Sequence, residues 1–281
     1  MKKRVTPQLW GIIGILISLV LPSFSYGDDL AYGLFNDGSE FGELDLTTGA
    51  VTDIGFAGGY FSGLGVGPSG VLYSGFNGGL FKVNTATGDA RDQYVGGTLG
   101  GTGYYLGSTS NGLLYGLEFQ SSNPEGIGLY SINPTTGSTS LIGITGITLP
   151  PQGYFVLSGL SNGSDNLYFA YLSKLYQLNT STGAATLIGS MPSGTETDGI
   201  DFQDGNLYGV QTSPALAIDQ FSISNGLPSV GPTAQDDFTS LTPYSVPEPA
   251  TISLLAVVGI GGVLHRPKRL ERRAIRFRRA G

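Results

Sequence analysis

Hydrophobic and polar residues alternate along most of the chain, and the alternation comes in a repeated unit. Each unit has a short alternating run, a turn that contains glycine, and a second alternating run. This period of two predicts β-hairpins rather than helices. Four similar copies begin at Glu43, Phe81, Tyr130 and Tyr176, the last reading YQLNTSTGAATLIG, and a degenerate copy, FSISNGLPSVG, begins at Phe221.

The turns of these copies have a recognisable chemistry. In the first four, an Asp or Asn opens the turn and a glycine follows four residues later. The Asx side chain can accept hydrogen bonds from the backbone two residues on, and glycine adopts positive φ without strain. We therefore assign these residues to turn formation rather than to catalysis. The opening residues are Asp45, Asn84, Asn133 and Asn179, and the turn glycines, with Asn225-Gly226 as the tight fifth turn, are Gly49, Gly88, Gly137, Gly183 and Gly226.

A further strand with a tyrosine precedes every hairpin, and four of these five strands have yet another short run before them. The first, around Tyr32, has no such run. Conversely, the run at 237–241, DFTSL, follows the last hairpin and has no hairpin of its own. Both observations are explained if the C-terminal run supplies the missing strand of the first unit and so closes a ring.

The repeat therefore predicts an all-β fold, a β-propeller of about five four-stranded blades, because the turn glycines recur every 39 to 49 residues. We also expect ring closure to remove exposed sheet edges. An open β-sandwich or a solenoid is the alternative. The predicted organisation is a signal peptide at 1–27, the propeller-like domain at 28–245 and a C-terminal segment at 246–281.

Charge is distributed unevenly along the chain. Between Asp28 and Val246 there are three cationic residues and nineteen acidic ones, a net charge of −16 within a chain of formal charge −7. A field of that sign repels phosphate backbones, so we expect no binding of nucleic acid. It serves solubility or, alternatively, attracts cations and cationic surfaces.

The N-terminus has the three parts of a secretory signal. Lys2, Lys3 and Arg4 are followed by an apolar run at 9–21 and by the small residues Ser25 and Gly27. This pattern predicts export across the inner membrane with cleavage after Gly27. An uncleaved membrane anchor is the alternative, although thirteen apolar residues are short for a stable span.

A second apolar stretch, at 250–264, lies between Pro249 and Arg266. As a helix it covers about 22 Å, which is less than the bilayer core of about 30 Å. Snorkelling of Arg266 and Lys268 to the headgroups can compensate. A buried core helix is the alternative, but eight cations follow Leu264 and disfavour it. The positive-inside rule places this tail in the cytoplasm and the acidic region outside it.

The last 35 or so residues resemble the PEP-CTERM sorting signal of Gram-negative bacteria. The resemblance rests on Val246, Pro247, Glu248 and Pro249, on the short apolar helix with glycines, and on the Arg-rich tail. It implies recognition by an exosortase, a membrane-embedded processing enzyme, and release to the cell surface or the exopolysaccharide matrix. The tail cations nearest the apolar stretch are Arg266, Lys268, Arg269, Arg272 and Arg273.

Candidate chemistry in the exported region is sparse. The chain has no cysteine, and its one histidine is His265 in the tail. Ser-His-Asp and Cys-His catalysis and imidazole or thiolate zinc sites are therefore excluded from the exported region. We predict no enzyme, no catalytic residues and no cofactor. The acidic cluster of Asp198, Asp201 and Asp204 is interpreted as a solvated turn, with a Ca²⁺ loop or a carboxylate hydrolase as alternatives.

Aromatic residues precede the first strand of successive units, at Tyr60, Tyr104, Tyr105 and Tyr154. A position that recurs once per blade lies on one rim of a ring, where tyrosine is suited to stacking on sugars. The alternative is that these rings pack between blades as core. The sequence thus predicts an exported surface or matrix protein that binds polysaccharide or protein partners. The alternatives are a carbohydrate-active enzyme that uses carboxylates alone and a Ca²⁺-stabilised scaffold.

Overall fold

A computed structural model describes residues 30–97, 105–109, 112–119, 126–147, 158–163, 166–203 and 205–243. The predicted signal peptide and sorting signal lie outside these ranges. The described residues form twenty β-strands and one 3₁₀ turn at Pro68–Gly70, with no α-helix among them. No helix in this part of the chain is long and apolar enough to span a bilayer.

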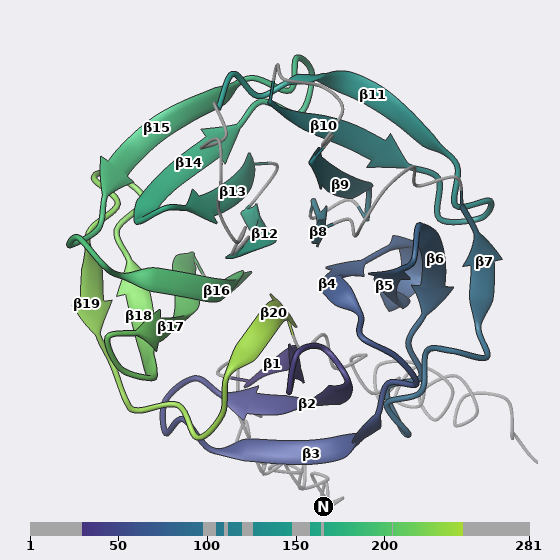
Figure 1. The fold of residues 1–281 in the computed structure, drawn as a ribbon, viewed down its shortest axis with the longest axis horizontal. Helices are drawn as coiled ribbons and strands as arrows, with labels where there is room; N and C mark the ends of the chain where they lie inside the picture. The colour runs from purple at the N-terminus through teal and green to yellow at the C-terminus, as the bar shows by residue number, and fades with distance from the viewer. Residues whose placement is uncertain are drawn as a thin grey trace, which may run out of the picture.

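The strands form five four-stranded antiparallel sheets arranged as blades around a central axis (Figure 1). Blade 1 contains β20 (Phe238–Pro243), β1 (Leu30–Phe35), β2 (Glu40–Asp45) and β3 (Val51–Phe56). Blade 2 contains β4 (Ser62–Val66), β5 (Leu72–Phe76), β6 (Gly79–Lys82) and β7 (Tyr94–Gly96). Blade 3 contains β8 (Tyr105–Ser108), β9 (Leu114–Phe119), β10 (Ile127–Ile132) and β11 (Thr139–Ile144).

Blade 4 contains β12 (Ser158–Gly163), β13 (Asn166–Tyr171), β14 (Lys174–Leu178) and β15 (Ala185–Ser190). Blade 5 contains β16 (Glu196–Gln203), β17 (Asn206–Ser213), β18 (Ala217–Phe221) and β19 (Pro228–Val230). In every blade the first strand in this order faces the axis and the last forms the circumference (Figure 1). The predicted all-β propeller of five four-stranded blades is confirmed.

The predicted closure of the ring is also confirmed. The last strand, β20, pairs antiparallel with β1, with Tyr32 opposite Thr242 and Ala31 opposite Pro243. The closing strand is also tied to the second blade, because the Leu64 backbone N–H donates a 2.8 Å hydrogen bond to the Ser240 hydroxyl. The first and last described residues therefore leave the ring side by side.

One expectation about the edges is wrong. Closure completes blade 1, but it does not remove exposed sheet edges, since β3, β7, β11, β15 and β19 each end a sheet at the circumference. In four of these five strands a β-bulge interrupts the pairing. Bulges twist an edge strand and make it a poorer template for another chain. The outer edges are thus irregular rather than absent.

The Asx turns form as predicted. In the first turn, Asp45 Oδ1 accepts hydrogen bonds from the backbone N–H groups of Thr47 and Thr48 at 2.8 and 3.0 Å. The Gly49 N–H closes the turn on the Asp45 carbonyl at 2.8 Å, and Gly49 has φ of 76°. These bonds hold the Asp45 pKa below its usual value against the opposing effect of burial.

The turn glycines also join neighbouring blades. A Cβ atom on Gly143 of β11 would lie 2.1 Å from the Thr182 carbonyl oxygen in the Asx turn of the next blade, and one on Gly189 of β15 would lie 1.6 Å from the Asn225 oxygen. Gly55 and Gly96 meet the corresponding turns of the blades that follow them. The repeated pair of glycines thus forms the two sides of one blade-to-blade contact, which only a residue without a side chain permits.

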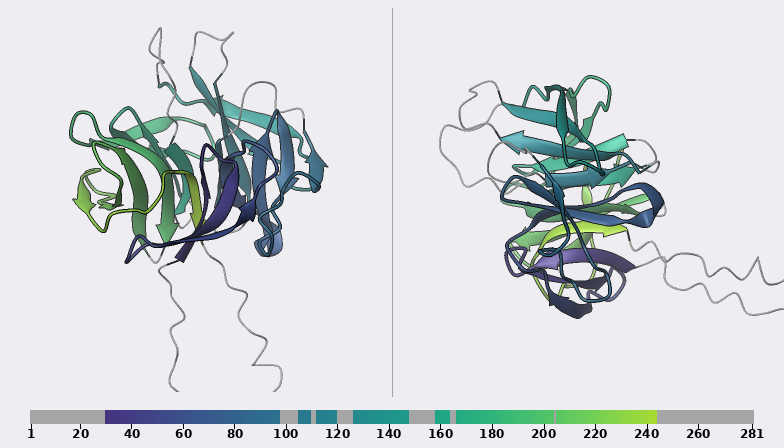
Figure 2. Two further views of the ribbon diagram at one scale, coloured as in Figure 1. Left: turned by 60° about the horizontal axis from the view of Figure 1, so that its bottom comes forward. Right: turned by 90° about the vertical axis from the view of Figure 1, so that its right-hand side faces the viewer.

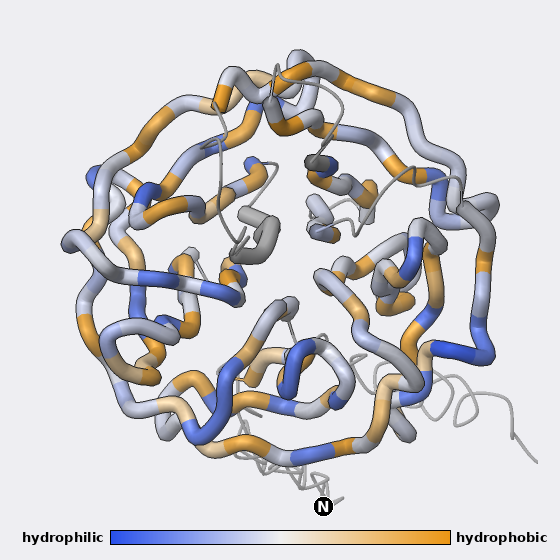
Figure 3. Tube along the Cα trace, in the orientation of Figure 1, coloured by the Kyte–Doolittle hydropathy of each residue, from blue (hydrophilic) through white to orange (hydrophobic). Residues whose placement is uncertain are grey.

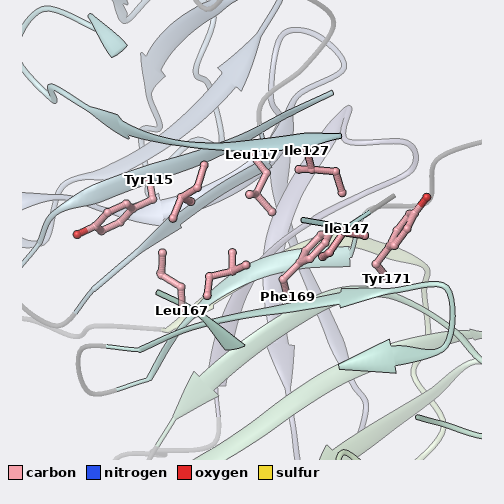
Figure 4. Packing of buried hydrophobic residues seen from close by; sticks show 9 residues of the cluster. Tyr115, Leu117, Ile127, Ile147, Leu167, Phe169 and Tyr171 are labelled. Carbon is pink, nitrogen blue, oxygen red and sulfur yellow. The ribbon is translucent and has the colours of Figure 1, made fainter. Parts of the chain in front are cut away.

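The core is divided among the five seams between blades. Each seam holds one cluster of buried apolar side chains. The cluster between blades 3 and 4 includes Leu117, Ile127 and Phe169 (Figure 4). Hydrophobic positions recur in every blade for this reason (Figure 3). Burial of apolar surface from both sides of each seam is what makes the ring cohere.

The ring has two faces that differ in the chain segments they carry. At one, which we call the terminus face, β1 begins and β20 ends. At the other, which we call the connector face, the chain passes from one blade to the next and the turns between second and third strands lie. Figure 2 shows β1 and β20 reaching the same face.

Candidate functional site

The predicted rim tyrosines have different environments. Tyr60 lies in the connector before β4 and is 70% exposed, whereas the adjacent Phe61 is buried in the seam between blades 1 and 2. Tyr105 begins β8 and packs partly buried against the cluster of blades 3 and 4. Tyr104 and Tyr154 lie outside the described residues. Of the described pair, only Tyr60 offers an open ring to a ligand.

The structure connects two candidates that the sequence treats separately. Burial and, to a smaller extent, the negative charge of Asp198 raise the pKa of Tyr105 to about 12. Asp198 lies in β16, the inner strand of blade 5, and Tyr105 lies in the inner strand of blade 3. The two side chains therefore lie close enough across the axis to interact electrostatically.

Asp198 itself titrates unusually for an aspartate. Burial raises its pKa to about 6, a hydrogen bond from Thr212 opposes that rise, and the nearby charges of Asp237 and Glu196 add to it. The carboxylates gather where β16 begins and just before β20, which is the seam where blade 5 meets blade 1. We call this the closing seam.

Asp201 is the most buried of the acidic candidates, with 1% of its surface exposed. Its Oδ1 accepts a 2.8 Å hydrogen bond from the Phe202 N–H, and its buried Oδ2 has no hydrogen-bond partner in the described part of the chain. Burial raises the Asp201 pKa to about 7. Asp201 pairs with Tyr208, a position that in the other four blades holds a small residue, namely Gly65, Gly107, Ser161 and Thr242.

The interpretation of this acidic cluster as a solvated turn is wrong for Asp198 and Asp201, which lie in the inner strand β16, Asp198 at an irregularity of its pairing with β17. The segment at 197–203, TDGIDFQ, is one of the short runs that precede the tyrosine strands, and its pairing with β17 takes precedence over its acidic character. Asp204 lies outside the described residues. Among the described residues no three acidic, histidine or cysteine side chains gather in a way that could hold a metal ion.

Two grooves lie at seams between blades, and each contains one of the two lysines of the acidic region. The larger, of about 670 Å³, lies between blades 2 and 3, and its lining contains Lys82, Asp92, Tyr73 and Tyr94. The smaller, of about 360 Å³, lies between blades 3 and 4 at the connector face. We call the second the lysine groove. Its lining residues are Thr145, Gly146, Ile147, Tyr171, Leu172, Lys174, Tyr176, Ala185 and Leu187.

The floor of the lysine groove is fixed by the seam. Thr145 bridges the two blades, because its N–H donates to the Ile127 carbonyl and its own carbonyl accepts from Ala185, both at 2.9 Å. Tyr171 is buried and stacks on Phe169 with ring centroids 5.9 Å apart (Figure 4). The groove thus has a rigid aromatic floor between two blades.

The rim of the groove contains an unusual turn. Leu172 and Ser173 join β13 to β14 and both have positive φ, 46° and 56°. The equivalent turn of blade 2 is Asn77-Gly78, which suits this conformation, whereas a leucine does not. The Ser173 hydroxyl donates to the Thr195 carbonyl at 2.7 Å and the Met191 N–H donates to the Ser173 carbonyl at 2.8 Å. These bonds hold the Leu172 side chain at the surface, where it is 58% exposed.

Lys174 is the one charged side chain in the described lining of the groove. Between Glu125 and Glu196 the chain contains only two charged residues, Asp165 and Lys174. Sequence reasoning missed this site. The signals were the lone lysine in a long stretch without acids and Leu-Ser at a tight hairpin turn.

Comparison with known proteins adds the fold alone. No protein-family model matches the chain, and no curated protein matches it. A chain of a nidogen–laminin complex is similar in structure, with a TM-score of 0.52 at 14% identity over 76% of this chain and 80% of that chain. A calcium-binding regucalcin from Agrobacterium tumefaciens gives a TM-score of 0.46 at 17% identity over 76% and 74% of the two chains.

Proposed function

We propose that this chain is an exported surface or matrix protein, sorted by an exosortase-type system, whose propeller is a non-enzymatic binding module. The observation that carries the proposal is the pairing of Ala31 with Pro243. Because both ends of the ring emerge together, the signal peptide and the sorting segment attach to the terminus face. The connector face then points away from the membrane and is free to bind.

The position of the sorting motif supports this arrangement. Three residues separate Pro243, the end of β20, from Pro247, so four Cα–Cα steps join the two prolines. Fully extended, that segment reaches about 14 Å. Prolines on either side of Glu248 favour an extended chain, which a processing enzyme needs for access. The ring would therefore sit directly above the membrane until cleavage releases it.

The geometry of the carboxylates supports binding over catalysis. A hydrolase that uses two carboxylates needs both at the substrate. Asp201 is enclosed in the seam, with one of its oxygens bonded to the Phe202 N–H. Tyr60, in contrast, is open on the connector face, and tyrosine stacks well on sugars. Exopolysaccharide is accordingly the proposed partner of that face.

Mass spectrometry of the cell fractions tests the sorting. The wild-type chain should be recovered outside the cell, beginning at Asp28 and ending near Pro247–Pro249, because both segments are removed. The triple variant P247A/E248A/P249A should stay in the membrane fraction with its Arg-rich tail intact. The control Y244A/S245A changes the same stretch but keeps the motif, and should be released. A wild-type chain that keeps its tail, or release of the triple variant like the wild type, would refute the proposal.

A further inference from the structure

We infer that the lysine groove binds a uronic acid residue of an acidic polysaccharide, with the sugar on the aromatic floor and its carboxylate on Lys174. The inference rests on the proposed function, because it takes the connector face as the binding face. The inference goes beyond the proposed function because it names the site, the blade seam and the chemical class of the ligand.

The charge of the groove selects an anion. Lys174 is exposed and, in the described ranges, forms no ion pair. The exported region as a whole is strongly acidic and repels anions, but the described lining of the groove contains no acidic residue. Screening in physiological salt limits the reach of exposed charges to about 8 Å. The lysine groove is therefore a local cationic site in an acidic protein, and a charge-assisted hydrogen bond to a carboxylate is the interaction it favours.

The walls of the groove favour a ligand that has a flat, partly apolar ring next to its carboxylate. Leu172 and Leu187 are 58% and 51% exposed, and Tyr176, which is partly buried, belongs to the same lining. A pyranose ring presents apolar C–H groups on its faces, which match the apolar walls of the groove. At about 360 Å³ the groove lies at the small end of ligand pockets, so it holds a residue of the polymer rather than a folded partner.

The turn at the rim supports a role beyond folding. A leucine in the left-handed region is disfavoured, and an Asn-Gly pair would fold there without strain, as it does at Asn77-Gly78. Exposing an apolar side chain from such a turn helps neither the core nor solubility. Departures of this kind from local preference are expected at functional positions. Leu172 extends the apolar wall next to Lys174 and would contact the sugar ring.

The groove between blades 2 and 3 provides a matched control. It also contains a lysine and tyrosines, but Asp92 shares its lining with Lys82. A carboxylate ligand there meets a carboxylate of the protein, which offsets the attraction of Lys82. The two lysines are therefore expected to respond differently to the same anionic sugar.

Isothermal titration calorimetry of the full chain in nonionic micelles tests the inference, with short oligogalacturonate as the probe. Its methyl-esterified form, which keeps the sugar and removes the charge, is the control ligand. Oligogalacturonate should bind, and the ester should bind about tenfold or more weakly. Lys174→Gln should weaken oligogalacturonate binding by a similar factor, and Lys82→Gln should leave it unchanged. Leu172→Asn should weaken binding while raising the melting temperature, which separates the contact from any folding defect.

Three results of this titration with oligogalacturonate would overturn the inference. These are equal binding of the acid and the ester, equal effects of the two lysine variants, and failure of oligogalacturonate to bind at all. Binding of polyglutamate as tightly as oligogalacturonate would also overturn it, because the site would then recognise any carboxylate and no sugar. None of these results bears on export, so a chain that is correctly cleaved but fails to bind would refute this inference and leave the sorting proposal standing.

Discussion

The closing seam and the seam between blades 3 and 4 are built from the same repeat, yet they have opposite chemistry. The closing seam gathers Glu196, Asp198, Asp201 and Asp237 around the inner strands β16 and β20. The seam of blades 3 and 4 lies well away from it around the ring (Figure 1) and carries a single lysine over a groove. One seam closes the fold, and we propose that the other binds a ligand.

The two seams also differ in how the blades meet. Between blades 3 and 4, Gly143 touches the Asx turn of the next blade, as the equivalent glycines do at the other internal seams. At the closing seam, Gly49 instead abuts the Thr233 carbonyl, and Gln235 bonds to both the Gly49 carbonyl and the Val51 N–H, each at 3.1 Å. At the internal seams the repeated glycines and turns supply the contact between blades. The contact that joins blade 5 to blade 1 requires residues outside the repeat.

The comparison shows that departures from the repeat indicate specialised positions. Asp201 stands where other blades have glycine, serine or threonine, and Leu172 stands where blade 2 has the asparagine of Asn77-Gly78. Neither substitution improves local folding. Asp201 places a buried acid in the closing seam, and Leu172 gives the lysine groove an apolar wall.

Adding a methyl group at an internal seam should have the largest effect on the free energy of unfolding. In Gly189→Ala the new Cβ would lie 1.6 Å from the Asn225 oxygen, so the backbone of one blade must move. We expect a loss of about 3 kcal/mol or more in the free energy of unfolding. Denaturant unfolding followed by circular dichroism measures it.

Gly59→Ala is the control for that change. Its Cβ would meet the rings of Phe76 and Phe61, at 3.2 and 3.5 Å, which are side-chain atoms rather than backbone. It should cost less than about 1 kcal/mol. Equal losses in the two variants would show that the glycine pair does not fix the distance between blades.

Acidification should stabilise the closing seam. Asp201 has a folded-state pKa of about 7 against 3.8 in a model peptide. Below about pH 4 it is protonated in both the folded and the unfolded state and carries no penalty. As the pH rises from about 4 to about 7, only the unfolded state ionises, so stability falls, by up to about 4 kcal/mol for a shift of this size.

Asp201→Asn should remove that part of the pH dependence, because the amide does not titrate. Asp198 and Asp219 each have a pKa raised to about 6, mainly by burial, and should maintain the remaining slope in the variant. Melting temperatures between pH 4 and pH 8 for the two chains make the comparison. A wild-type chain whose stability rises over this interval would contradict the assignment of Asp201 to a dry seam.

The sequence predicted the fold well because the fold depends on local signals. Asp45 and Gly49 specify a turn within five residues, the tyrosine strands repeat at a fixed place, and the unpaired run at 237–241 leaves one way to complete the first blade. The irregular outer edges were not foreseen, since bulges such as that between Phe41 and Gly42 depend on pairing rather than on composition.

The candidate sites were harder to predict because they depend on contacts between distant segments. Lys174 becomes a groove residue only when Thr145 and Ile147 of the preceding blade pack beside it. In the sequence, Asp201 is one of several acids in a polar segment. Only its pairing opposite Tyr208 shows that its side chain is buried in the closing seam. Aligning the inner strands with one another would have marked it, because the other blades have no acid at that position.

Mapping of backbone amide shifts by NMR, as oligogalacturonate is added to the full chain in micelles, tests the division of roles between the two seams most directly. We predict that the shifts cluster at Thr145–Ile147 and Tyr171–Tyr176, with the amides of Glu196–Asp201 and Asp236–Asp237 unchanged. Shifts confined to the closing seam or centred on Tyr60, or no shifts at all, would contradict the assignment of ligand binding to the seam between blades 3 and 4.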